Sequence, residues 1–483
     1  MWMPPLRQRL RGHSSNRPNR MIDAKSRSDV DSNKSAGKAM KQTSIQLDTT
    51  ITAEAMKHAD AAMLDSLQQA AFNYFPKASN PRNGLVADTT RQGSPASIAV
   101  VGFALSSYPV AVEHGWIERD AAVQACLRSM RFFWHSDQSG SPEATGYQGF
   151  YFHFLDMETG ARVWQSELSL IDTALLIAGM LTAATYFDAS TPAEVELREL
   201  AERLYLRVDW RWAQYQGATV AQGWKPECGF LHYGWEGYSE AILLYVLGLG
   251  SPTHPFTAAS FEAWTVTYQW ENLYGYDFLY AGPLFIHQFS HAWIDFRGIR
   301  DRFMREKRCD YFENSRRATY VQREYAIRNP HTFLGYADNC WGLSAGEGPS
   351  AGPRLIGIGG QQQRFFGYAA RGVPYGPDDG TIAGTSITAS LVFAPEIALP
   401  AMRNLHDAGT PQQVDALRSS GINASFNAPG DACWISEGEF GLDQGMTVLM
   451  IENYRSGLLW QLGRQSSILQ TGLRRAGFKS GWL

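Results

Sequence analysis

Residues 237–247 read GYSEAILLYVL, in which a glutamate is followed by an unbroken apolar stretch. A helix that is apolar on every side has to be buried, because it has no polar face to turn toward water. Comparable apolar helical runs recur along the chain, and a loop rich in glycine, aromatic residues and carboxylates precedes each of them. The other runs begin near Ser94, Glu167, Leu284, Thr381 and Asp443.

The segments between these runs are more polar and charged, as at residues 193–208 and 310–329. Amphipathic helices of this kind can pack on a buried helix and still face water. Six buried helices that alternate with amphipathic ones predict an all-α fold, an (α/α)6 barrel made of two concentric rings. The loops that enter the inner helices are long, so the aromatic-rich loops should gather at one end of the barrel.

The same periodicity gives approximate helix boundaries. The inner helices are predicted at residues 94–107, 168–187, 238–249, 284–294, 381–393 and 445–460. The outer helices are predicted at residues 53–74, 119–135, 193–210, 256–268, 310–328, 396–406 and 461–474.

The domain organisation follows from the spacing of these helices. A chain of 483 residues often forms two or three domains. Here the helix pairs follow one another almost end to end, without a linker rich in Ser, Gly or Pro. We therefore predict one helical domain at residues 51–483. Residues 1–50 are polar, rich in Arg, Lys, Ser and Asn, and poor in aromatic residues, which predicts a disordered tail.

The composition argues against several classes of partner and site. The net charge is −4, with acidic and basic residues interspersed, which argues against nucleic acid as the main partner. The five cysteines contain no CxxC pair, so neither a zinc site nor a disulfide framework is indicated. No run is long and apolar enough to predict a membrane span. The sequence carries no signal for a particular oligomeric state.

The N-terminal stretch bears on localisation. It contains no apolar segment of the kind found in secretory signals, which predicts a cytoplasmic protein for the sequence as written. Met21 and Met40 are alternative start positions. With another start, a periplasmic or secreted location would be compatible with the sequence.

Glu240 is the first candidate for catalysis. A carboxylate in a buried helix is costly unless it is paired, protonated or used in chemistry. Desolvation would raise its pKa, as a general acid requires, whereas the helix N-terminus favours the anion. N-terminal capping is the structural alternative. Asp443 mirrors Glu240, because it directly precedes another apolar run, and it has the same alternative.

Two carboxylates that face one cleft from different inner helices are what glycosidic hydrolysis needs. One protonates the leaving oxygen, and the other activates water or attacks the sugar. Glu167 and Asp172 open the second inner helix. Capping by Ser166 and the helix dipole explain Glu167 on structural grounds. Asp172 lies inside an apolar run, so we expect it to accept hydrogen bonds from the barrel lining or from substrate.

Several loop residues are candidates for substrate binding. Asp88, Arg91 and Asp379 lie in turn-forming loops, where their side chains suit sugar hydroxyls, although turn chemistry alone also explains them. The C–H faces of sugar rings pack on aromatic side chains, and burial beneath the loops is the alternative. The aromatic candidates are Trp164, Trp235, Tyr238 and Trp434.

His287, His291 and Asp295 are spaced four residues apart, which places them on one helical face. Gln288 stands where the HExxH motif has its glutamate, so a metalloprotease site is not indicated. A metal site of another kind is the minor alternative. We expect these residues to line the barrel, with His287 among those that contact substrate.

Six ordered segments of the chain resemble a known family. They are GFYFHFLDM at 149–157, SELSLIDTALL at 166–176, GYSEA at 237–241, SPTHP at 251–255, residues 287–297 and IENYRSG at 451–457. Together they resemble the bacterial glucoamylase-like family of six-hairpin glycosidases, which includes endo-β-1,2-glucanases. The resemblance covers most of the chain after about Ala53. It implies an (α/α)6 barrel that hydrolyses β-glucan, expected to be β-1,2-linked, with no cofactor and no metal.

The resemblance also implies roles for the acidic residues. Glu240 matches the position of the family's general acid. Asp443, Glu167 and Asp172 all match acidic positions of the family and are candidates for its partner. Characterised members are usually exported, whereas the N-terminal stretch of this chain is polar.

We therefore predict a glycoside hydrolase that cleaves β-1,2-glucan internally by acid/base catalysis between paired carboxylates. The alternatives are a β-glucan transglycosylase, a polysaccharide lyase and a non-catalytic glycan-binding barrel. A lyase would need a Tyr or His base beside a cation, and an acidic cleft argues against it. Because Glu240 and Asp443 come from different inner helices, we expect a wide cleft and an inverting mechanism with Asp443 as base. Glu167 is the rival partner.

Overall fold

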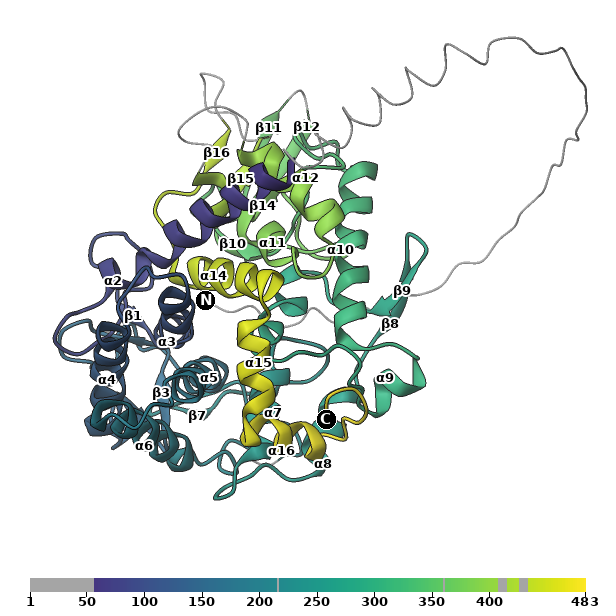
Figure 1. Cartoon of the computed structure of the whole chain (residues 1–483). Coiled ribbons are helices and arrows are strands. Elements are labelled where there is room, and N and C mark those ends of the chain that lie inside the picture. The colour runs from purple at the N-terminus through teal and green to yellow at the C-terminus, as the bar shows by residue number, and fades with distance from the viewer. Residues whose placement is uncertain (1–55, 215–216, 359–360, 407–414, 425–432) are drawn as a thin grey trace, which may run out of the picture. The chain divides into compact units, whose positions relative to one another are not determined.

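The computed structural model describes residues 56–214, 217–358, 361–406, 415–424 and 433–483 (Figure 1). Residues 63–483 form one compact unit, and residues 1–62 are grouped apart from it. The described part of that first group, residues 56–62, is helical. The tail predicted at residues 1–50 lies outside the described residues.

Helices dominate the described chain, which confirms the prediction of a mainly helical protein. The longer helices are α3 (Ile98–Glu113), α4 (Arg119–His135), α5 (Leu170–Tyr186), α6 (Pro192–Arg207), α10 (Tyr311–Arg328), α12 (Pro395–His406) and α14 (Gly441–Arg455). The shorter ones are α2 (Tyr74–Ala78), α7 (Ile242–Gly250), α8 (Ala259–Thr265), α9 (Arg302–Glu306), α11 (Gly384–Ala389), α15 (Leu458–Gln465), α16 (Ser467–Arg475) and the 3-10 turns η1 (Leu284–His287), η2 (Phe289–Ala292) and η3 (Asp415–Arg418). Within the described residues, no helix combines the length and the apolarity that crossing a membrane requires.

Short antiparallel strands occupy the loops. The largest sheet has the order β2-β3-β5-β6-β7, formed by Gly146–Tyr147, Phe150–Phe152, Leu168–Ser169, Gly223–Lys225 and Gly229–Phe230. The other strands are β1 (Ala96–Ser97), β4 (Phe154–Leu155), β8 (Trp270–Leu273), β9 (Tyr276–Leu279), β10 (Ala345–Gly346), β11 (Arg354–Ile358), β12 (Gln361–Phe365), β13 (Ala369–Ala370), β14 (Thr381–Ile382), β15 (Ile422–Asn423) and β16 (Trp434–Ile435). β1 and β5 run directly into α3 and α5, so these pairings fix how the loops enter the helices.

The apolar helices pack on one another. α3 packs on both α5 and α14, α5 packs on α7, and α11 packs on α14 (Figure 1). Hydrogen bonds join the remaining neighbours. Ser290 in η2 accepts from the backbone N–H of Leu243 in α7, and Gln288 beside η2 donates to the Ser386 carbonyl of α11.

The more polar helices cover these apolar ones. α4 packs on α3 and α6, α6 on α5, α12 on α11, and α16 on α7. α12 buries one face, formed by Ile397, Ala398, Ala401, Met402 and Leu405, and this spacing is that of an amphipathic helix. α3 is different, because every residue from 98 to 111 is buried.

A pair of glycines sets the distance between α3 and α5. A Cβ atom on Gly102 would lie 2.4 Å from the Leu175 carbonyl oxygen, and one on Gly179 would lie 2.1 Å from the Gly102 carbonyl oxygen. No side chain fits at either position, so the two backbones approach directly. The N-terminus of α5 is fixed by Ser169, whose side chain accepts from the Asp172 N–H.

One predicted inner helix is wrong. Residues 284–294 form the two 3-10 turns η1 and η2 instead of a continuous α-helix. The reason is tertiary, because neighbouring elements use the groups that a helix would pair internally. Ser315 donates to the His287 carbonyl, which a helix would pair with the His291 N–H, and the His291 N–H instead donates to the Gln288 carbonyl.

Other inner helices differ from the prediction at their ends. α7 begins at Ile242, so Glu240 lies in the turn before the helix, where Ser290 donates to its carbonyl. α11 is shorter than predicted, because residues 381–382 pair with β15. The run predicted at 445–460 divides into α14 and α15 at Gly457, which has a left-handed φ of 70°.

Candidate functional site

Four carboxyl groups approach one another where apolar helices begin, and we call them the carboxyl cluster. Asp172 lies in the first turn of α5, and Asp443 in the first turn of α14. Asp88 lies in the loop before α3, where its carbonyl accepts from the Gly441 N–H at 2.8 Å. Glu240 completes the cluster from the turn before α7.

Electrostatic coupling connects the four carboxyl groups. The charge of Asp172 acts on both Asp88 and Glu240, and the charge of Asp88 acts on Asp443. Each anion therefore disfavours ionisation of its neighbour. The sequence predicted three of these residues as catalytic candidates and Asp88 as a binding residue, and the structure brings all four together.

Glu240 is 7% exposed. Burial raises its pKa to about 7, its own backbone N–H opposes the rise, and the negative charge of Asp172 adds to it. The prediction weighed burial against the helix N-terminus, and burial has the larger effect. Near neutral pH this carboxyl group is therefore protonated in a substantial fraction of molecules.

Asp443 and Asp88 are half-buried, and their pKa values also rise. Burial raises the pKa of Asp443 to about 7, the facing hydroxyls of Thr385 and Ser420 oppose the rise, and the charges of Asp88 and Glu347 add to it. Burial raises the pKa of Asp88 to about 6, although the positive charge of His153 works against it.

His153 was not among the predicted site residues, and it bridges two that were. Its Nδ1 lies 3.0 Å from Oε1 of Glu167, and its Nε2 lies 3.5 Å from Oδ2 of Asp172. Burial lowers the pKa of this histidine, but the charges of Asp172, Glu167 and Asp88 together raise it to about 9. His153 therefore carries a positive charge at neutral pH.

Glu167 stays ionised beside this cation. Burial raises its pKa, but the hydrogen bond and the charge of His153 outweigh burial and lower it to about 2. The pairing of β3 with β5 produces this contact, because the His153 N–H donates to the Glu167 carbonyl at 2.9 Å. Asp172 has a further partner, since the Ser169 hydroxyl donates to its carboxylate.

The aromatic candidates separate into exposed and buried residues. Trp164 is 70% exposed, and its backbone has a left-handed φ of 57°. Trp434 is half-buried. Trp235 and Tyr238 are buried, and the Tyr238 ring packs against His287 at 5.1 Å between centroids. Only Trp164 and Trp434 offer much ring surface to a ligand.

The histidine face predicted on residues 287–295 is buried. Nε2 of His287 lies 3.1 Å from the Ala281 carbonyl oxygen, and burial lowers the pKa of this histidine to about 4. His291 contacts the Ser315 hydroxyl, whereas Asp295 pairs with Arg297. Across the described ranges, no group of three or more His, Cys, Asp or Glu residues is arranged to hold a metal ion.

Asp379 is fully buried and forms a two-pronged ion pair with Arg371. Its oxygens accept from Nε and Nη2 of the arginine at 2.7 and 2.9 Å. The backbone N–H groups of Phe366 and Thr381 also donate to it. The role of Asp379 in substrate binding stays a prediction, and in the structure both of its oxygens are occupied by protein groups.

Arg91 is likewise engaged. Its guanidinium donates to both oxygens of Glu347 and, at 2.8 Å, to the Glu437 carbonyl. It also lies 5.1 Å from the centroid of the Phe440 ring. Arg91 therefore ties the loop before α3 to two distant segments.

A groove opens next to the carboxyl cluster, and we call it the Tyr368 groove. It is lined by residues 347–351, residues 367–368 and Trp434, and its volume is about 340 Å³. Tyr368 was not predicted as a site residue and is 67% exposed. Desolvation raises the pKa of Tyr368, and the charges of all four cluster carboxyls add to this rise.

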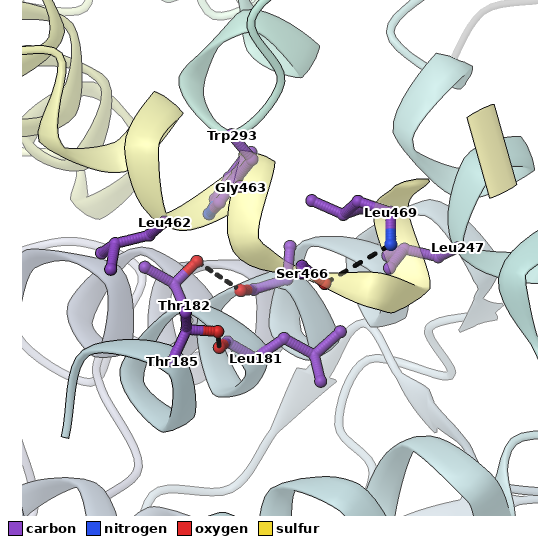
Figure 2. A pocket seen from close by; sticks show the side chains of 10 residues that line it. Leu181, Thr182, Thr185, Leu247, Trp293, Leu462, Gly463, Ser466 and Leu469 are labelled. Carbon is purple, nitrogen blue, oxygen red and sulfur yellow. Dashed lines mark hydrogen bonds between the residues drawn. The ribbon is translucent and has the colours of Figure 1, made fainter. Parts of the chain in front are cut away.

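Figure 2 shows a second cavity, between α5, α7, α15 and α16. It holds only about 10 Å³, which is barely enough for one water molecule. Its polar groups are already used, since the Thr182 and Thr185 hydroxyls donate to carbonyls of their own helix. Thr182 lies ten residues beyond Asp172 along α5, or about 15 Å. This cavity is therefore separate from the carboxyl cluster.

Residues 232–467 match the family model described as "Putative glucoamylase". A solved structure from Bacteroides uniformis carries the same description. It is 27% identical, with a TM-score of 0.76, over 88% of this chain and 98% of that one.

Two relatives have names that state an activity. An exo-β-1,2-glucooligosaccharide sophorohydrolase (non-reducing end) from Parabacteroides distasonis is 24% identical over 460 residues. The match covers 88% of this chain but 59% of that protein, so the chain spans about three-fifths of its length. An endo-β-1,2-glucanase from Chitinophaga pinensis, solved with sophorotriose and glucose, is 24% identical with a TM-score of 0.74. That match covers 88% of this chain and 99% of the glucanase.

The Arg371–Asp379 pair should contribute strongly to stability. Asp379→Ala leaves a buried arginine without its partner and should lower the free energy of unfolding by about 3–5 kcal/mol. The double variant Arg371→Met/Asp379→Ala leaves no uncompensated charge, so it should cost less than the sum of the two single changes. Urea denaturation measures both effects. The control is Glu196→Gln, which breaks an exposed pair with Arg131 and should cost under about 1 kcal/mol. Equal losses for Asp379→Ala and Glu196→Gln would contradict this assignment.

Proposed function

Residues 232–467 of this chain belong to the glucoamylase-like family, and on that basis we propose that the protein is a glycoside hydrolase that cleaves β-1,2-glucan. The observation that carries the proposal is the burial of Glu240, which raises its pKa to about 7, in a cluster with carboxyl groups from other helices. Glycosidic cleavage needs one carboxyl group to donate a proton and another to act as base or nucleophile. A barrel that only binds glycan would have no use for a carboxyl group whose pKa is raised to about 7.

For the architecture we propose a single catalytic domain at residues 51–483, built as an (α/α)6 barrel. Three observations support it. The apolar elements form a closed series. α14 packs on α3, α3 on α5, and α5 on α7. Hydrogen bonds join α7 to η2 and η2 to α11, and α11 packs on α14. More polar helices cover this set. Proteins named glucoamylase or glucanase share the fold.

In the proposed mechanism Glu240 is the general acid. Its burial keeps the proton available near neutral pH, and it loses that proton to the glycosidic oxygen as the bond breaks. The negative charge of Asp172 favours the protonated form before the reaction. After proton transfer, the N-terminus of α7 stabilises the new carboxylate.

Asp443 is the proposed base. It activates water, directly or through a sugar hydroxyl. Asp88 and Glu347 are the acidic groups that act on Asp443, while Asp172 is the one that acts on Glu240. Glu240 and Asp443 enter from the starts of different helices, α7 and α14, which supports a wide cleft. Inverting enzymes space their carboxyls by roughly 6.5–9.5 Å, so we propose inversion of configuration.

Glu167 is a weaker candidate for the partner. Its carboxylate is held by His153, and a nucleophile engaged in that ion pair would first have to leave it. We propose instead that Glu167, His153 and Asp172 act as a charged unit. In that unit, His153 offsets the negative charge of Glu167 and lies 3.5 Å from the Asp172 carboxyl group.

For substrate binding we propose the exposed ring of Trp164 and the half-buried ring of Trp434, together with Asp88 at the edge of the cluster. Tyr238, Trp235 and His287 would support the site from beneath, since they are buried. Arg91 and Asp379 would support substrate binding indirectly. Arg91 holds Glu347 and the Glu437 carbonyl, and Asp379 holds Arg371. Sugar binding sites commonly combine a few polar groups with aromatic walls.

The β-1,2 linkage is proposed from the printed names of the sophorohydrolase and the endo-glucanase. One of these names states exo-action and the other endo-action. We propose endo-action on β-1,2-glucan, without a cofactor.

A panel of β-1,2-glucan, β-1,3-glucan and starch tests the proposed function. We expect release of reducing ends from β-1,2-glucan alone, as a range of oligosaccharide lengths. Proton NMR of the first products should show the α-anomer, because inversion converts a β-linkage. Sophorose as the sole product would indicate exo-action, and a β-anomeric product would move the partner role to Glu167. Absence of reducing ends from every glucan would overturn the function.

Glu240→Gln should lower kcat by about 100- to 10,000-fold, because general acid catalysis typically contributes that much. Binding of β-1,2-glucan should persist, since glutamine keeps the shape of the side chain. Asp443→Asn should give a loss of similar size. The control is Glu236→Gln, an exposed glutamate in the same loop, which should retain the wild-type kcat. A loss below about threefold in Glu240→Gln would remove Glu240 from the mechanism.

A further inference from the structure

We propose that the Tyr368 groove is a subsite that binds one glucosyl unit of the glucan next to the carboxyl cluster, with the Tyr368 and Trp434 rings against the sugar. This inference rests on the proposed function, because it takes β-1,2-glucan as the ligand. It adds Tyr368 and the groove wall at residues 347–351 to the site, neither of which the sequence indicated.

The groove lies against the loop that carries Asp88, because Arg91 of that loop donates to Glu347 on the groove wall, and this contact is the first support. Tyr368 lines the groove and at the same time is acted on by the charges of Asp443, Asp88, Glu240 and Asp172. Glu347, on the groove wall, acts on Asp443. A glucan chain that leaves the cluster on this side therefore enters the groove directly.

The lining suits a sugar in both size and chemistry. About 340 Å³ lies at the small end of the range of about 300–1,000 Å³ for small-molecule sites. Two aromatic rings offer surfaces to the C–H faces of a pyranose. The Glu347 carboxylate and the backbone groups of residues 348–351 offer partners for its hydroxyls. The bidentate contact with Arg91 balances the charge of Glu347 and holds its carboxylate in place.

The floor of the groove is fixed before any ligand arrives. Nη1 of Arg371 donates to the carbonyls of Gly346 and Glu347, at 3.0 and 3.2 Å. Its Nη2 donates to the Gly367 carbonyl at 3.1 Å. The buried ion pair with Asp379 thus joins both sides of the groove. A site held in this way loses little entropy on binding.

Glycine brings the two sides close together. A Cβ atom on Gly367 would lie 2.8 Å from the Ser350 carbonyl oxygen, so this position has no room for a side chain. Directly after it, Tyr368 lines the groove with 67% of its surface exposed. The Trp434 wall is set in a similar way, because a Cβ atom on Gly421 would lie 3.1 Å from its ring.

Tyr375 provides a matched comparison. It is a tyrosine on the same stretch of chain, with 71% of its surface exposed, and its ring contacts Tyr280 instead of the groove. If exposed tyrosines on this stretch were only surface residues, Tyr368 and Tyr375 would respond alike to substitution.

Calorimetric binding of β-1,2-glucooligosaccharides to the inactive Glu240→Gln protein tests the subsite. Tyr368→Ala and Trp434→Ala, each added to that protein, should weaken binding by about tenfold or more. Tyr368→Phe keeps the ring and should restore most of the affinity. Tyr375→Ala should leave binding within about twofold. In the active enzyme, Tyr368→Ala should raise KM more than it lowers kcat.

Each other outcome has a definite meaning. Unchanged affinity in both Tyr368→Ala and Trp434→Ala, with a wild type that degrades β-1,2-glucan, would overturn the subsite and leave the proposed function standing. An equal loss in Tyr375→Ala would assign the effect to loosening of the whole stretch and would also overturn the subsite. A wild type that neither binds nor cleaves β-1,2-glucan would overturn the proposed function itself, and the subsite with it.

Discussion

Removal of water from carboxyl groups is the constraint on which this site depends. The inner helices are apolar along their length, so an acidic residue where such a helix begins is surrounded by protein and loses hydration. The N-terminal dipole partly compensates, but burial has the larger effect at Glu240 and raises its pKa to about 7. The same packing that buries the apolar core therefore raises the pKa of Glu240. Burial of this carboxyl group lowers the stability of the fold at neutral pH, and it keeps a proton available on Glu240.

Two cations, the half-buried His153 and the buried Arg371, hold the acidic site together in different ways. His153 lies between Glu167 and Asp172 and supplies positive charge within hydrogen-bonding reach of the cluster. Arg371 pairs with Asp379 beneath the Tyr368 groove and joins the two segments that form it. The first cation sets the charge balance of the carboxyls, and the second fixes the geometry of the groove. Burial makes the Arg371–Asp379 interaction strong, because little water competes for its partners.

The sequence predicted the features that depend on neighbouring residues along the chain, which are mainly the helices. Periodicity located α4 at its observed bounds, 119–135, and identified the apolar runs that become α3, α5 and α14. It failed at residues 284–294, where side chains from other elements replace helical hydrogen bonds. His153 was missed because its partnership with Glu167 arises from strand pairing, which has no signature in an aromatic run. Tyr368 was missed because it lies in a long glycine-rich stretch without periodicity. The roles assigned to the acidic residues stay predictions.

The central claim is that burial keeps Glu240 protonated, and the pH dependence of stability tests it most directly. A carboxyl group whose pKa is raised on folding from 4.5 to about 7 contributes stability below the unfolded value, and that stability is lost as pH rises through the folded value. Glutamine cannot titrate, so a comparison of Glu240→Gln with the wild type reports the titration of Glu240 together with its coupling to Asp172. Between pH 4 and pH 8, the difference in unfolding free energy should shift by about 3 kcal/mol in favour of Glu240→Gln. A difference that does not change with pH, or that shifts toward the wild type, would contradict the claim.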